Sequence, residues 1–235
     1  MVKSRLSQYE FVTLMAFLMS IVALAIDALL PAINQISADI GIQNSTNNQL
    51  LITMIFLGLG FGQLIFGPIS DSVGRKPVVF MGFGVFIIAS FICINATDLN
   101  TMIFGRILQG IGLSAPRTIS IAIIRDSYSG DYMARIMSFV TVVFILVPIV
   151  APAMGKFVLD HYNWQTIFYI QLFFSVLVSI WFWIRQPETL LENQQIKFSS
   201  HIFSDGLKEL MKYKRTIGFT IISGFITGSF MVYLS

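Results

Sequence analysis

Apolar residues along this chain fall into long runs that are separated by short polar segments. Each run holds roughly 20 residues, enough to cross the hydrocarbon core of a bilayer as a helix. The runs cover Phe11–Leu30, Leu50–Ile69, Pro77–Ala96, Met102–Ile124, Ile136–Gly155, Trp164–Ile184 and Thr216–Ser235. They lack the alternating pattern of a membrane β-barrel, so their backbone groups must bond within helices. The pattern therefore predicts an all-α transmembrane protein.

The polar segments divide the chain into three predicted parts. Residues 1–184 are expected to form a six-helix transmembrane bundle, residues 185–215 a cytoplasmic loop, and residues 216–235 a seventh transmembrane helix. Six spans, a long loop and a new span are the layout in which a second six-span half follows. We therefore expect this chain to be the amino-terminal half of a longer membrane protein whose second half is truncated.

The long loop contains an amphipathic pattern. Apolar residues at helical spacing lie beside Lys208, Lys212 and Lys214, and these apolar residues are Phe203, Leu207, Leu210 and Met211. Two interpretations remain open: a cationic helix lying on the inner leaflet, or a linker helix packed on the bundle.

Lysine and arginine are distributed unevenly between alternate loops. Twelve lie in the amino tail and in the second, fourth and sixth loops, whereas Lys156 stands alone on the opposite side. Because basic loops stay in the cytoplasm, the amino terminus is expected there, in a multi-pass protein of the bacterial inner membrane. The net charge of +3 thus reflects topology, and we expect no nucleic-acid partner.

Composition supports a membrane protein and offers little for an enzyme. Residues are 55% hydrophobic and 11% charged, whereas soluble domains carry about a quarter charged residues. The single Cys93 and the distant His161 and His201 cannot form a disulfide framework or a Cys/His metal site. His-Glu-x-x-His, Gly-x-Ser-x-Gly and phosphate-loop patterns are absent from the sequence. We expect no enzymatic activity, no cofactor and no metal, with energy drawn from an ion gradient.

Three ionisable residues lie well inside the predicted spans, namely Asp27, Arg106 and Arg117. Such residues are costly in lipid and mark functional sites. A carboxyl group opposite an arginine can be poised to take and release a proton as geometry changes. Asp27 is therefore a candidate for proton coupling or for balancing a cationic substrate. The alternative is a hydrated carboxylate at the membrane exit, four residues before Pro31.

The fourth span carries a polar stripe. Arg106 and Arg117 are eleven residues apart, which places them about 20° from the same helix face. Gln109 lies beside this stripe, and Gly110 and Gly112 allow another helix to approach closely. The stripe predicts a substrate cavity. The alternatives are a structural ion pair for Arg106 and local bonding to the backbone for Arg117.

The second loop is a tight connection that combines small, acidic and basic residues. It runs from Gly67 to Pro77 and includes Asp71, Gly74, Arg75 and Lys76. The glycines permit close packing and unusual turn geometry, whereas the charged residues anchor the chain at the cytoplasmic face.

This loop resembles the signature of the major facilitator superfamily, which reads approximately Gly-x-Leu-Ala-Asp-Arg-x-Gly-Arg-Lys. A second motif of the family, Arg-x-x-Gln-Gly-x-Gly in the fourth helix, is similar to the segment from Arg106 to Gly112. In the fifth helix, the drug/proton antiporters of the family carry a Gly- and Pro-rich motif. The residues that resemble it are Pro148, Ala151, Pro152 and Gly155.

Further stretches resemble the bicyclomycin and chloramphenicol resistance subfamily of twelve-helix drug/proton antiporters. They are Asp27–Ala32, Asp71–Pro77, Met137–Phe139, Trp164–Phe168 and Pro187–Leu190. The resemblance implies that Asp27 and Arg106 line a central cavity and take part in proton coupling. It also implies that Asp71 and Arg125 belong to a cytoplasmic latch that closes against the other half. Arg117 replaces a residue that is usually small in the subfamily.

The expected function is a proton-coupled secondary transporter that exports drugs or other small amphipathic compounds in exchange for protons. Its partners would be the bilayer, a drug-like substrate, protons and the missing carboxy-terminal half. Pro148 and Pro152 each remove a backbone hydrogen bond, so a bend at this point could supply a gate or a fixed kink. Two alternatives remain: a half that does not transport, or that pairs with a separately encoded half, and a proton-coupled metabolite symporter.

Overall fold

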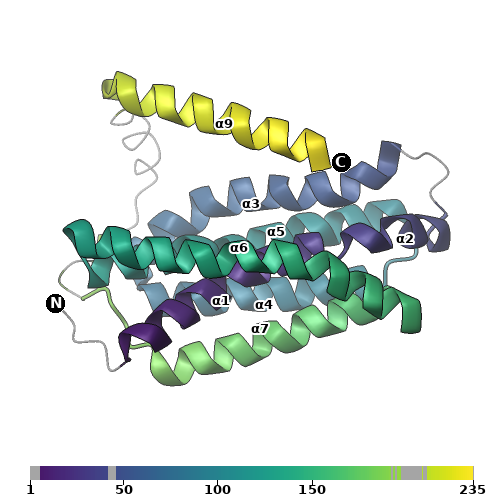
Figure 1. Ribbon diagram of the computed structural model, residues 1–235, viewed down its shortest axis with the longest axis horizontal. Coiled ribbons are helices and arrows are strands. Elements are labelled where there is room, and N and C mark those ends of the chain that lie inside the picture. Colours follow the sequence, from purple (N-terminus) through teal and green to yellow (C-terminus); the bar gives the residue numbers. More distant parts are fainter. Residues whose placement is uncertain are drawn as a thin grey trace. The chain divides into compact units, whose positions relative to one another are not determined.

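The computed structural model describes residues 6–41, 46–191, 193, 195–196, 208 and 211–234. These residues divide into two compact units, residues 1–196 and residues 197–235, which are treated separately below. The first unit is a bundle of long helices (Figure 1). Its elements are α1 (Gln8–Asp27), η1 (Leu30–Ala32), α2 (Ile33–Asp39), α3 (Thr46–Val73), α4 (Arg75–Ile94), α5 (Leu99–Ser127), α6 (Gly130–His161) and α7 (Gln165–Arg185).

Six helices in the described part of the chain are long and apolar enough to cross a membrane. They coincide with the first six predicted spans, so the predicted all-α transmembrane bundle is confirmed. In the second unit, α9 (Lys214–Leu234) covers most of the predicted seventh span, Thr216–Ser235. Its crossing of the membrane and the three predicted domain boundaries stay predictions. Phe203, Leu207 and Leu210 of the predicted amphipathic helix lie outside the described residues.

The first span is interrupted earlier than predicted. α1 ends at Asp27, and the chain passes through a short turn into η1 and then α2. Pro31 lies in η1 and has no backbone N–H, and in a continuous helix its ring would collide with the carbonyl group of Asp27. The apolar segment Gln8–Asp39 that contains the predicted span is therefore divided into α1, η1 and α2, and Asp27 lies at a helix end.

The predicted loop from Gly67 to Pro77 is almost entirely helical. α3 continues to Val73 and α4 begins at Arg75, so Gly74 alone separates the two helices. Gly74 has a φ of 111°, a conformation that side chains other than that of glycine rarely adopt. The tight connection was predicted correctly, but it is a single-residue corner and not a loop.

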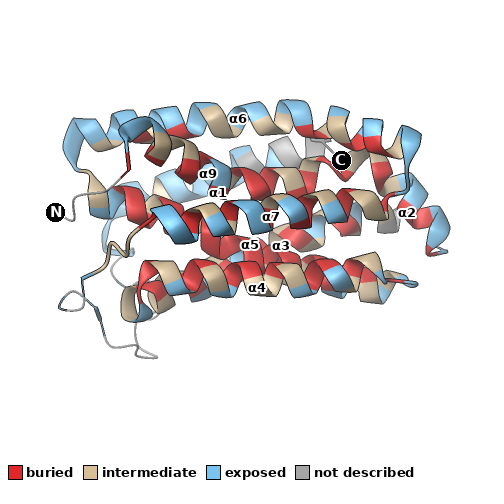
Figure 2. Ribbon diagram, turned by 90° about the horizontal axis from the view of Figure 1, so that it is seen from below, coloured by how far each residue is buried: buried red, intermediate tan, exposed pale blue. Residues whose placement is uncertain are grey.

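Helix α5 lies at the centre of the bundle, between α3 and α4 (Figures 1 and 2). Glycines allow this close approach on both sides. A Cβ added at Gly110 would overlap the carbonyl oxygen of Ile55 in α3, and one added at Gly112 would lie 2.7 Å from the carbonyl oxygen of Gly82 in α4. The helices therefore pack backbone against backbone, as small residues permit in membranes.

Helices α6 and α7 cover the sides of the bundle and leave much of their surface exposed (Figure 2). α6 packs mainly on α1 and η1, whereas α7 packs on α1 and α4. Large apolar side chains such as Ile145, Ile149 and Phe173 lie on the exposed surfaces. Such surfaces suit lipid or another transmembrane half, because neither requires polar side chains.

Candidate functional site

The Arg106 side chain is fully buried in the middle of the bundle. Its Nε donates a hydrogen bond to the carbonyl oxygen of Leu51 in α3 at 2.8 Å. Its Nη1 donates to the carbonyl oxygen of Ala25 in α1 at 3.2 Å and to Oε1 of Gln109 at 2.9 Å. Gln109 in turn donates to Oγ of Ser90 in α4 at 2.8 Å. Arg106 and Gln109 therefore connect four helices through hydrogen bonds.

The bond to Ala25 closes the carboxyl end of α1. The last carbonyl groups of a helix lack partners within the helix. The Leu29 N–H, which would bond to Ala25 in a continuing helix, bonds to the Ile26 carbonyl at 3.3 Å. The guanidinium of Arg106 satisfies the Ala25 oxygen in its place. Arg106 thus stabilises the end of α1 two residues before Asp27.

Asp27 is half-buried as the last residue of α1. Among the residues that the structure describes, none forms a hydrogen bond or an ion pair with its carboxylate. The structure therefore does not join Asp27 to Arg106, and the partners of the buried guanidinium are carbonyl oxygens and an amide oxygen. The two side chains lie near the end of α1 without a hydrogen bond or ion pair between them.

The glycine of the fifth-span motif packs directly on this helix end. A Cβ added at Gly155 would overlap the carbonyl oxygen of Ala28 and lie 3.1 Å from Cγ of Pro31. Ala151, one turn earlier, is buried, whereas Pro148 and Pro152 are half-buried and α6 runs as one helix through both. α6 therefore contacts the α1 break directly after Asp27. A gate at the two prolines stays a prediction.

A second polar cluster joins the corner between α3 and α4 to α5. The buried guanidinium of Arg75 forms ion pairs with Asp71, one turn earlier, and with Asp126 of α5 at 2.9 Å. Its Nη1 also donates to Oγ of Ser70 at 2.7 Å. Asp71 and Arg75 of the predicted gating motif are thus brought together. Arg125 lies one residue before Asp126 and takes no part in this ion pairing.

The amino end of α4 is capped by a residue that lies much later in the sequence. Gly74 has no side chain to cap this end, and Glu188, which follows α7, accepts hydrogen bonds from the backbone N–H groups of Arg75 and Lys76 at 3.0 and 2.8 Å. A carboxylate at a helix amino terminus also interacts favourably with the helix dipole. The Lys76 ammonium donates to the Trp183 carbonyl at 2.7 Å. The end of α7 is therefore fastened to the start of α4.

Asp126 and Glu188 were missed as site residues from the sequence. Asp126 follows directly after Arg125, and only the helical register of α5 decides which of the two faces Arg75. Glu188 lies in a stretch that resembles the family, but it is 113 residues from Arg75. Its position as an acidic residue directly after a span could have identified Glu188 as a candidate. Its partners could not be predicted, because they are two backbone N–H groups, which nearly every residue has.

Replacing Glu188 with alanine is expected to loosen the start of α4. Two backbone N–H groups lose a charged acceptor, so the local free energy of opening should fall by about 2 kcal/mol. Hydrogen–deuterium exchange would then accelerate about thirtyfold at Arg75 and Lys76 and remain unchanged at Ser90, one turn before the other end of α4. Glu188→Gln, which keeps one acceptor oxygen, should give an intermediate rate. Unchanged exchange at Arg75 and Lys76 in the alanine variant would show that the cap contributes nothing.

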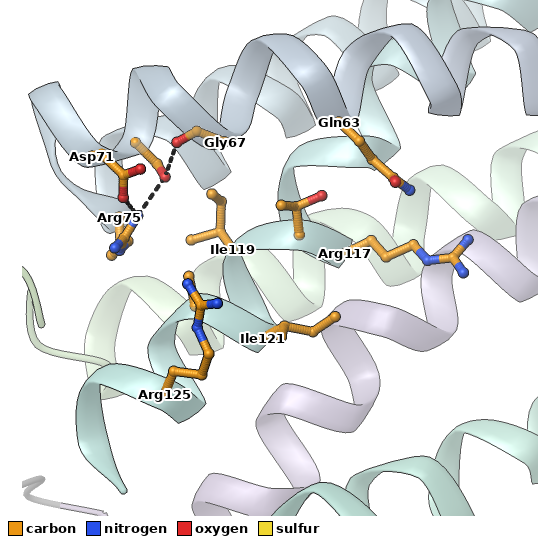
Figure 3. A pocket seen from close by; sticks show the side chains of 11 residues that line it. Gln63, Gly67, Asp71, Arg75, Arg117, Ile119, Ile121 and Arg125 are labelled. Atoms are coloured by element: carbon orange, nitrogen blue, oxygen red, sulfur yellow. Dashed lines mark hydrogen bonds and ion pairs between the residues drawn. The ribbon is translucent and has the colours of Figure 1, made fainter. Parts of the chain in front are cut away.

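A pocket of about 320 Å³ with both polar and apolar lining lies between α3 and α5 beside this cluster (Figure 3). Arg117 and Gln63 lie at one end of the pocket, and the Asp71–Arg75 pair lies at the other (Figure 3). Arg125 also lines it. No carboxylate in the described part of the chain pairs with Arg117 or Arg125. The structure thus places Arg117 with the predicted gating motif and apart from the hydrogen bonds of Arg106.

Comparisons with known proteins agree with this architecture. Residues 15–235 match the family model of the Major Facilitator Superfamily. The chain is 28% identical to a bicyclomycin resistance protein homolog of Haemophilus influenzae, over 97% of this chain and 57% of the relative. It is 31% identical to the uncharacterized MFS-type transporter YdgK of Bacillus subtilis, over 94% of this chain and 56% of the relative. It is 32% identical to the multidrug resistance protein MdtL of Citrobacter koseri, over 66% of this chain and 40% of the relative.

A solved structure shares the fold. The crystal structure of the human organic anion transporter MFSD10 (TETRAN) matches with a TM-score of 0.64 at 18% identity, over 86% of this chain and 53% of that chain. The chain spans about half the length of the curated relatives it matches. The fold, the family match and the relatives confirm the resemblance found in the sequence: this multi-pass membrane chain belongs to the major facilitator superfamily.

Proposed function

We propose that this chain supplies the amino-terminal half of a transporter that exports drug-like compounds across the bacterial inner membrane in exchange for protons. The names of two relatives, a bicyclomycin resistance protein homolog and a multidrug resistance protein, support drug export. The relatives are about twice as long as this chain, so a second half would complete the transport pathway. The excess of basic residues in alternate loops supports a cytoplasmic amino terminus.

One observation carries the proton-coupling part of the proposal: the half-buried carboxylate of Asp27 lies at a break in a transmembrane helix, without an ion-pair partner among the described residues. A carboxylate inside a membrane bundle is costly and marks an ion or proton pathway. Broken helices in transporters commonly form such sites. Asp27 would take up a proton when it faces the outside and release it when it faces the cytoplasm.

The packing around the break offers a way to couple this proton to movement. Arg106 bonds to the Ala25 carbonyl on one side of Asp27, and Gly155 of α6 contacts Ala28 on the other. Exposure of the carboxylate therefore depends on where α5 and α6 lie relative to α1. Rocking of one transporter half against the other would move α6 and change the access of water to Asp27.

The test uses everted inner-membrane vesicles that contain the complete protein to which this chain belongs. Respiration acidifies the vesicle interior, and bicyclomycin, the compound in the name of one relative, is then added. Exchange of the compound for internal protons should dissipate the pH gradient, measured as recovery of acridine-dye fluorescence. Vesicles that contain only the 235-residue chain serve as the control and should show no recovery. Export of the compound with an unaltered pH gradient would exclude proton exchange.

A further inference from the structure

Two arginines of α5 line the pocket between α3 and α5 without an acidic partner. Arg117 is half-buried and lies ten residues before Ser127, about 15 Å along the helix from its end. Arg125 is exposed near that end. No ion pair involves either guanidinium in the part of the chain that the structure describes. An arginine at this depth is costly unless something balances its charge.

The acidic residues near the pocket are already engaged. Asp71 is the single carboxylate among the described residues that line it and pairs with Arg75, and Asp126 pairs with Arg75 as well. Among the residues that the structure describes, three arginines therefore line the pocket and two carboxylates line or border it, which leaves a net positive charge. Both carboxylates bond to the same guanidinium, so the charges of Arg117 and Arg125 remain available to an incoming anion.

The remaining lining suits the rest of a small amphipathic molecule. Ile121 and Ala122 supply apolar surface, whereas Gln63 and Thr118 supply hydrogen-bonding groups. The cavity volume of about 320 Å³ lies at the lower end of the range of small-molecule sites. Figure 3 shows the polar ends of Gln63 and Arg117 at the same end of the pocket. A planar acid group could thus bind the guanidinium through two hydrogen bonds.

We propose that this pocket binds a small amphipathic anion, with a carboxylate group held by Arg117 and its apolar part against Ile121 and Ala122. Arg125, nearer the end of α5, draws the anion toward the pocket, since exposed charge acts mainly on the approach of a ligand. The inference rests on the proposed transport function and adds acidic compounds to the drug-like molecules that the transporter would bind. A cationic drug would be repelled from the pocket by the charges of the same arginines.

The test compares two probes that share one ring system and differ in charge, naphthalene-1-acetate and naphthalene-1-acetamide. Binding to the purified chain in a nonionic detergent is read as protection against heat unfolding, since a ligand of the folded state stabilises it. Cys93 reports unfolding, because it is the single cysteine and is fully buried, so that a maleimide reaches it after the fold opens. The apparent Kd of the acid should be about tenfold lower than that of the amide.

Variants separate a specific site from general electrostatics. Arg117→Gln should abolish the preference for the acid, whereas Arg117→Lys keeps the charge and should keep most of it. Arg135→Gln is the matched control, because it removes an exposed arginine of α6 that does not line the pocket, and the preference should persist. Equal Kd values for the two probes in the unaltered chain, or a preference that survives Arg117→Gln, would overturn the inference.

The complete protein provides the last arm of the test. If a carboxylate from the second half neutralises Arg117, the preference for the acid seen with the 235-residue chain disappears in the complete protein, and the pocket is then no substrate site. If the preference persists there, an external anion is supported as the occupant. Bicyclomycin-driven proton release in vesicles is measured in parallel, so failure of the anion site is distinguished from failure of the transport proposal.

Discussion

Replacing Asp27 with asparagine is expected to abolish proton release by the complete protein when substrate is added to energised everted vesicles. The amide has nearly the shape of the carboxyl group but cannot carry a proton between the two sides. No hydrogen bond or ion pair to the carboxylate is lost within the described part of the chain. The free energy of unfolding should therefore change by less than about 0.5 kcal/mol. Fluorescence recovery of the acridine dye should fall to the level of vesicles without the protein.

The matched control for this prediction is Asp160→Asn. Asp160 is an exposed carboxylate of α6 that pairs with Lys156 at 3.2 Å, far along the chain from the α1 break. Its replacement changes the net charge by the same amount and should leave proton release unchanged. Undiminished proton release in the Asp27→Asn variant would remove Asp27 from the mechanism. Asp27 would then be a hydrated carboxylate at the helix end.

The positions of the six spans could be predicted from hydrophobicity, because lipid requires long apolar helices and little else satisfies that requirement. Their ends could not be predicted in the same way. α6 has 32 residues and is therefore about 48 Å long, well beyond the hydrocarbon core. Its outer turns are not constrained by lipid, so hydropathy does not mark them. Pro31 could have been used to predict the early end of α1. The end is not visible in the hydropathy pattern, because apolar residues continue on both sides of it.

The candidate site shows a similar division. Arg106 and Gln109 could be singled out because polar groups inside apolar spans are rare. Their partners could not be identified, since the oxygens of Leu51 and Ala25 are backbone groups that every residue carries. The corner at Gly74 could be predicted as tight from its glycine. Its capping by Glu188 depends on where α7 ends in space, which no local pattern expresses.

These contacts tie one end of the bundle and its middle to the same central helix. At one end, Arg75 pairs with Asp126 of α5, and Glu188 caps the helix that begins with Arg75. Deeper in the bundle, Arg106 of α5 caps α1. A shift of α5 relative to α3 or α4 would disturb both sets of bonds. Helix α5, which carries Arg117 and Arg125 of the proposed anion site, is therefore also the helix whose position these bonds require to be maintained.

Replacing Gly58 with alanine is expected to destabilise the bundle severely. An added Cβ would overlap the carbonyl oxygen of Ile107 and lie 2.9 Å from its carbonyl carbon, and both atoms belong to the backbone of α5. No side-chain rotation relieves such a contact, so α3 and α5 would have to separate. Separation would also disturb the bond between Arg106 and Leu51. We expect a loss of about 3 kcal/mol in the free energy of unfolding.

Gly60, two residues later in the same helix, provides the control. It is exposed, and a Cβ added there meets no atom within 4 Å. Because alanine favours helix over glycine, Gly60→Ala should leave stability unchanged or raise it by up to about 1 kcal/mol. Heat unfolding followed by maleimide labelling of Cys93 would rank Gly58→Ala well below the unaltered chain and Gly60→Ala at or above it. Equal unfolding temperatures for the two variants would mean that α3 and α5 do not cross in backbone contact at Gly58, and the positions of Leu51 and Arg106 would then have to be reconsidered.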